Sequence, residues 1–115
     1  MKTFWKIAVG LQLALIATSS AVAADAARGK LLFDKVGCYQ CHGHQGQGAN
    51  TGPRLAPEPL ALESFLSFVR SAAATNMPPY SKKLVSDTDM TDIHAYLSSI
   101  KPPPSAKNIP LLNIK

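Results

Sequence analysis

Hydrophobic residues recur along much of this chain at the spacing of helical faces, and they predict three main helices joined by long loops. The first helix is expected from about Ala26 to Val36, with Asp25 as its N-cap. The second is expected from Leu60 to about Ala73. Its apolar residues fall at i, i+3, i+4 and i+7, namely Leu62, Phe65, Leu66 and Val69. No segment alternates with period two over a useful length, so the pattern predicts an all-α fold.

The last predicted helix begins at Ser86 and ends near Lys101, just before three consecutive prolines. Ser86 and Asp89, three residues later, have the spacing of a capping box. The apolar stripe of this helix consists of Met90, Ile93, Tyr96, Leu97 and Ile100. The stretch from Gly43 to Pro59 holds four glycines and three prolines, so it is predicted to be a loop.

The N-terminal segment, residues 1–23, has the pattern of a secretory signal peptide. Lys2 and Lys6 form its positive region, an apolar stretch follows, and small residues near Ala23 and Ala24 provide the cleavage site. The apolar run is short for a membrane span, which needs about 20 residues. We therefore expect export with cleavage near Ala23 or Ala24, which in a bacterium means the periplasm. An uncleaved membrane anchor is the alternative.

Length and composition narrow the class of protein further. A chain of 115 residues allows one small domain, expected over residues 24–101 and followed by a Pro-rich tail over residues 102–115. Without Lys2 and Lys6, ten basic residues face seven acidic ones, and this balance of +3 is too weak to indicate nucleic-acid binding. Short helices with long loops make a thin core, so the sequence predicts that a large apolar group fills the middle of the domain.

The sequence Cys38-Tyr39-Gln40-Cys41-His42 has the spacing of a haem c attachment motif. Cys38 and Cys41 can each form a thioether to a haem vinyl group, and His42 then lies under the iron as its proximal ligand. A redox dithiol and half of a zinc site are the other interpretations of two cysteines at this spacing. The chain has no second cysteine pair, and the adjoining His42 and the export signal favour one covalent haem c.

Met77 is predicted to be the second axial ligand of the iron. A thioether is a soft neutral donor, and ligation by histidine and methionine raises the reduction potential of haem. Pro78 restricts the backbone of Met77 and Pro79 stiffens the loop. The alternative is that Met77 fills a gap in the core, as is expected of Met90. Two histidines are weaker candidates for the iron: His44 lies close to His42, and His94 is expected at the surface.

From about Asp25 to Lys101 the chain resembles a small bacterial class I cytochrome c. The residues that match are the haem motif, Gly52-Pro53-Arg54-Leu55, Met77-Pro78-Pro79-Tyr80, and Asp92 to Leu97 in the last helix. The resemblance implies helices and long loops wrapped around one haem, with the Pro53 carbonyl accepting a hydrogen bond from His42. It also implies close packing of the first and last helices at Gly29. A glycine tolerated on an exposed face is the alternative.

The predicted function is that of a periplasmic one-electron carrier, which is not an enzyme by itself and exchanges electrons with redox partner proteins. Two other functions stay open. One is a permanent subunit of a periplasmic dehydrogenase, similar to flavocytochromes of the p-cresol methylhydroxylase type. The other is a small-gas sensor in which Met77 dissociates. Arg54 and Arg70 each have two interpretations, as a partner of a haem propionate or as a solvated surface residue. The apolar tail is either a frayed terminus or a docking arm.

Overall fold

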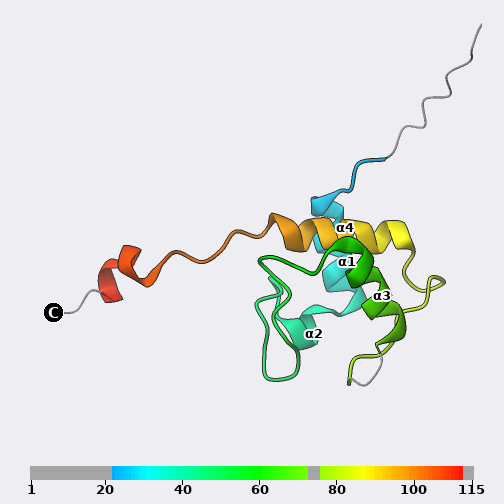
Figure 1. Cartoon of the computed structure of the whole chain (residues 1–115), viewed down its shortest axis with the longest axis horizontal. Helices are drawn as coiled ribbons and strands as arrows, with labels where there is room; N and C mark the ends of the chain where they lie inside the picture. The colour runs from blue at the N-terminus through cyan, green and yellow to red at the C-terminus, as the bar shows by residue number, and fades with distance from the viewer. Residues whose placement is uncertain (1–21, 73–75, 113–115) are drawn as a thin grey trace, which may run out of the picture.

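The computed structural model describes residues 22–72 and 76–112, so the predicted signal peptide lies almost entirely outside the described residues. The described residues form helices and loops and no strand, which confirms the all-α prediction. The elements are α1 (Ala26–Val36), α2 (Tyr39–His42), α3 (Leu62–Ser71) and α4 (Asp87–Ser99), followed by the 3-10 turns η1 (Ala106–Asn108) and η2 (Pro110–Leu112) (Figure 1). None of the described helices is long and apolar enough to cross a bilayer.

The core of the domain lies where α1 packs against α4 (Figure 1). Phe33 of α1 and Leu97 of α4 have no exposed surface, and the Phe33 ring meets the Tyr96 ring edge-on at a centroid distance of 5.7 Å. A Cβ atom built on Gly29 would lie 1.9 Å from the carbonyl oxygen of Asp92. Gly29 is therefore a point of close approach between the two helices, and the exposed-face alternative is wrong.

Polar side chains fix the first turn of α1 to α4. The buried carboxylate of Asp92 accepts a hydrogen bond from the backbone N–H of Asp25 at 2.8 Å and another from the Arg28 guanidinium. Arg28 also pairs with Asp89. The hydrogen bond between Ser86 and Asp89 holds the pKa of Asp89 below its usual range, and the hydrogen bond from Arg28 lowers it further. A buried carboxylate needs partners of this kind, so the cluster specifies how the two helices meet.

The caps of α1 and α4 are those predicted. Asp25 accepts hydrogen bonds from the backbone N–H groups of the first turn of α1, and the capping box of Ser86 and Asp89 is complete. By contrast, α3 is two residues shorter at each end than predicted. The carbonyl of Leu60 lies 2.8 Å from Nε2 of His94, and Ala72 adopts a left-handed conformation with φ 39°. Contacts with α4 and a backbone reversal therefore set the ends of α3.

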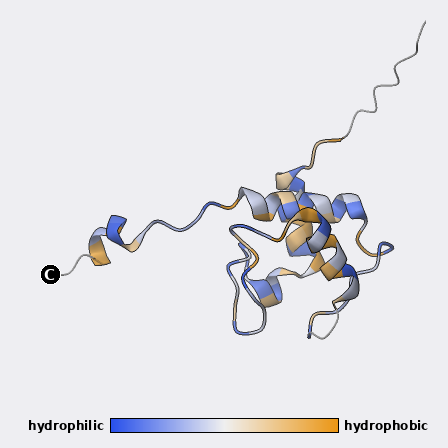
Figure 2. Cartoon of the chain, in the orientation of Figure 1, coloured by the Kyte–Doolittle hydropathy of each residue, from blue (hydrophilic) through white to orange (hydrophobic). Residues whose placement is uncertain are grey.

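The tail leaves the end of α4 and runs away from the helices (Figure 1). Its prolines predict an extended segment, but the described part also contains the turns η1 and η2. The final turn is hydrophobic (Figure 2), with Leu111 87% and Leu112 58% exposed. The described tail therefore presents apolar side chains to solvent.

Candidate functional site

The predicted haem motif lies on one short helical turn, α2, directly after α1. Gly37 ends α1 in a left-handed conformation, and the backbone N–H of Cys38 donates to the Phe33 carbonyl at 3.1 Å. The sequence pattern did not predict this turn, because four residues are too few to show helical periodicity. Since Cys38 and Cys41 are three residues apart on a helical turn, their side chains lie on one face.

Cys38 and Cys41 form no disulfide, and they differ in exposure: Cys38 is partly buried and Cys41 is exposed. Burial raises the pKa of the Cys38 thiol to about 11, and the Asp34 carboxylate adds to the rise. The two thiols can each reach a reactive group bound on the same side of α2.

His42 is 7% exposed, and its Nδ1 lies 2.7 Å from the carbonyl oxygen of Pro53. A carbonyl can only accept a hydrogen bond, so Nδ1 carries the proton and Nε2 keeps its lone pair for a metal. Gly52 permits this approach, because a Cβ there would lie 2.6 Å from the Cys41 carbonyl oxygen and 3.0 Å from Nδ1 of His42. The contact between His42 and Pro53 that the resemblance implies is present.

The loop that carries Met77 packs against the core from the side of α3. Met77 and Tyr80 are partly buried, and the backbone N–H of Tyr80 donates to the Val69 carbonyl at 2.9 Å. Burial raises the pKa of the Tyr80 phenol, and charge on Cys38 or Cys41 would raise it further. The Met77 loop and α2 are thus within electrostatic range of each other, although they are far apart in the sequence.

These residues fit a haem c. They offer two thiols on one face of a turn, a histidine with Nε2 available, and a methionine in a Pro-flanked loop. Several apolar side chains that pack against the core are only partly buried, and they include Leu55, Leu66, Met77 and Tyr80. When bound, haem c supplies a one-electron couple at its iron. Within residues 22–72 and 76–112, no three His, Cys, Asp or Glu side chains come together as ligands for a metal ion.

The other two histidines have protein partners. The His44 ring stacks on Tyr39 at a centroid distance of 4.5 Å, and its Nδ1 lies 3.6 Å from the Asp34 carboxylate. His94 is partly buried rather than on the surface as expected, because its Nε2 binds the Leu60 carbonyl and its ring meets Phe65 edge-on. His94 therefore joins α4 to the residues that precede α3.

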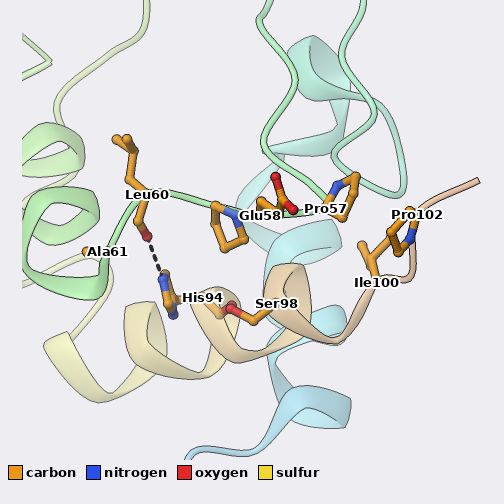
Figure 3. Close-up of a pocket in the computed structure, with 9 residues that line it drawn as sticks. Pro57, Glu58, Leu60, Ala61, His94, Ser98, Ile100 and Pro102 are labelled. Carbon is orange, nitrogen blue, oxygen red and sulfur yellow. Dashed lines mark hydrogen bonds between the residues drawn. The ribbon is translucent and has the colours of Figure 1, made fainter.

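An open hollow of about 390 Å³ lies between residues 57–61 and the C-terminal half of α4. Figure 3 shows His94, bonded to Leu60, at one end of it and Pro57 and Pro102 at the other. The residues predicted to hold the haem do not line it, and of the weaker candidates only His94 does. The hollow is separate from the candidate haem site.

Sequence reasoning missed the position of Arg70. Its guanidinium donates to the carbonyls of Tyr80 and Val85 and to the carboxylate of Asp87, and it is largely buried. These partners lie 10 to 17 positions further along the chain. No local pattern could therefore have identified them.

The fold and the site together define a cytochrome c domain. It is small and helical, its motif from Cys38 to His42 lies on a turn after the first helix, and its first and last helices pack together at a glycine. The chain belongs to the family described as cytochrome c oxidase, cbb3-type, subunit III, which matches residues 24–97. Members of this family carry covalently bound haem c and transfer electrons to or from redox partners.

Two kinds of relative support this assignment. The cbb3-type cytochrome c oxidase subunit CcoP of Helicobacter pylori (strain 52) is 28% identical over 81 residues, which cover 65% of this chain and 28% of the relative. Cytochrome c-552 of Acidithiobacillus ferridurans is 30% identical over 86 residues, covering 67% of this chain and 37% of the relative. The chain thus spans little more than a quarter of the length of the oxidase subunit. No solved structure matches the chain significantly.

Proposed function

We propose that this chain is an exported, periplasmic one-electron carrier whose haem is attached through Cys38 and Cys41 and ligated by His42 and Met77. The observation that carries the proposal is the 2.7 Å contact between Nδ1 of His42 and the Pro53 carbonyl, beside two cysteines on the same turn. That contact fixes the tautomer and the ring plane of His42, and it makes Nε2 a better donor to a metal.

The proposal includes a division of the chain. Residues 1–23 are a cleaved signal peptide, residues 24–101 are the haem domain, and residues 102–115 are a tail. With both axial positions taken by side chains of this chain, a substrate cannot readily reach the iron. The chain alone then moves electrons through the haem edge and catalyses no reaction of its own.

Replacing Met77 by leucine tests the axial ligation. Leucine has nearly the volume of methionine but no sulfur, so Met77→Leu is expected to abolish the charge-transfer band between sulfur and ferric iron and to lower the reduction potential. Near-infrared absorption and potentiometric titration measure both. The matched control is Met90→Leu, the same change at a methionine buried in the core, which is expected to leave the band in place.

Two results would contradict the ligand assignment. One is a wild-type protein without the charge-transfer band. The other is rapid carbon monoxide binding by the folded ferrous wild type, which would favour the function of a small-gas sensor.

A second candidate function is that of a permanent subunit of a respiratory oxidase, because the family and one relative are named for such a complex. Neither relative's name points to a dehydrogenase. The exposed Leu111 and Leu112 of the tail suit a fixed contact with a larger protein.

Fractionation of the source organism separates these two functions. A free carrier is expected in the periplasmic fraction as a single chain, and deleting residues 104–115 should leave it there. A subunit is expected to co-purify with oxidase haem in a fixed ratio from detergent extracts, and the same deletion should release it. Haem-stained gels and absorption spectra of the fractions distinguish the two results.

A further inference from the structure

Arg70, in the last turn of α3, reaches across to the segment that follows Met77. Its Nη1 donates to the carbonyl of Tyr80 at 2.8 Å and to the carbonyl of Val85 at 2.9 Å, and its Nη2 lies 2.6 Å from Oδ1 of Asp87. The side chain is 18% exposed. Three of its five N–H groups are thus committed to one short stretch of chain and the start of α4.

Tyr80 is held to α3 twice. Its backbone N–H donates to the Val69 carbonyl at 2.9 Å, and its own carbonyl accepts from Arg70. The two residues between Met77 and Tyr80 are prolines, whose rings fix φ near −65°. A fixed Tyr80 therefore limits where the backbone of Met77 can lie.

Arg70 also connects this stretch to α4. Lys82 lies 2.7 Å from the second carboxylate oxygen of Asp87, and Lys82 and Arg70 together hold the pKa of that carboxylate below its usual range. The charge of Arg70 thus has a carboxylate partner at Asp87, whose side chain is 46% exposed. Without Arg70, the carbonyls of Tyr80 and Val85 would lose a charged donor, and such bonds are stronger than neutral ones.

We propose that Arg70 is a positioning residue, which keeps Met77 in the place from which its sulfur ligates haem iron. This inference rests on the ligation by His42 and Met77 proposed above. A thioether is a weak, neutral ligand, so the fraction of molecules with the sulfur on the iron depends on how rarely the loop moves away. The contact of Arg70 with the Tyr80 carbonyl exists only while Tyr80 stays against α3, so it favours the ligated arrangement.

The test measures how readily an added ligand displaces Met77. Ferric wild type, Arg70→Gln and Arg70→Lys are titrated with imidazole at a temperature where all are folded, while the sulfur-to-iron band is followed. We expect the apparent affinity for imidazole to rise about tenfold or more in Arg70→Gln, the effect of losing at least one charge-assisted hydrogen bond from the closed loop. Arg70→Lys keeps the charge but not the fork geometry, so a smaller rise is expected.

Arg28→Gln is the matched control. Arg28 also pairs with carboxylates of α4, at Asp89 and Asp92, but it has no contact with the segment that follows Met77. Its loss should lower the unfolding midpoint and change imidazole affinity less than threefold. Equal shifts in Arg28→Gln and Arg70→Gln, or no shift in Arg70→Gln, would overturn the role of Arg70. A wild type without the band would instead overturn the proposed ligation.

Discussion

Replacing Cys38 and Cys41 together by alanine is expected to reduce covalently bound haem from about one per chain to none, because no other cysteine is available for a thioether. We also expect the double variant, which lacks haem, not to fold. Ten hydrophobic residues are buried among the described residues, and the largest that are fully buried are Phe33, Met90, Ile93 and Leu97. So small a core leaves a domain of this length marginal without a further apolar group.

The measurement combines two assays on protein produced in an exporting host with haem attachment machinery. Extraction into acidified organic solvent separates covalent from loosely held haem, and circular dichroism reports helix content. The single variants Cys38→Ala and Cys41→Ala are the controls, since each keeps one thiol for a thioether and is expected to retain part of the pigment. A double variant that kept unextractable haem would refute attachment through these cysteines, and a fully helical apoprotein would refute the dependence of the fold on haem.

The parts of the fold that follow local rules were predictable from the sequence. The N-cap at Asp25 and the capping box at Ser86 and Asp89 depend on side chains within three residues of the groups they bind, and both are present. The start of α3 was not predictable, because His94, 34 positions away, binds the Leu60 carbonyl. Distant partners of this kind leave no periodic signal.

The candidate site also has a part that the sequence predicts and a part that only the structure shows. Its chemistry is concentrated in the motif from Cys38 to His42 and in the loop at Met77, where residue type and spacing are informative. The supports of the site are not local. Pro53 is 11 positions from His42, and Arg70 contacts Val85 and Asp87 across 15 and 17 positions. Pro53 could be proposed only through the resemblance, and the contacts of Arg70 required the structure.

Gly29→Ala is expected to destabilise the protein, although helix propensity alone predicts the opposite. Alanine in place of glycine within a helix stabilises by about 0.8–1 kcal/mol. In α1, however, the new Cβ would lie 1.9 Å from the carbonyl oxygen and 2.4 Å from the carbonyl carbon of Asp92. These are backbone atoms, which cannot rotate away as the end of a side chain can. The helices must therefore separate, which weakens the contacts of Phe33 with Tyr96 and of Arg28 with Asp92.

Overpacking of this kind costs about 1–3 kcal/mol and sometimes more, and a clash with backbone atoms belongs at the upper end of that range. After subtracting the gain of about 1 kcal/mol from helix propensity, we expect a net loss of about 2 kcal/mol and a fall in Tm of about 10 °C. Denaturant and thermal unfolding of the haem-loaded protein measure it. The control is Leu31, which is 69% exposed on the same helix, where the difference between Leu31→Ala and Leu31→Gly reports propensity alone. If Gly29→Ala stabilised the protein by that same difference, α1 and α4 would not be in close contact at Gly29. Because the two effects have opposite signs, the direction of the shift is enough to decide.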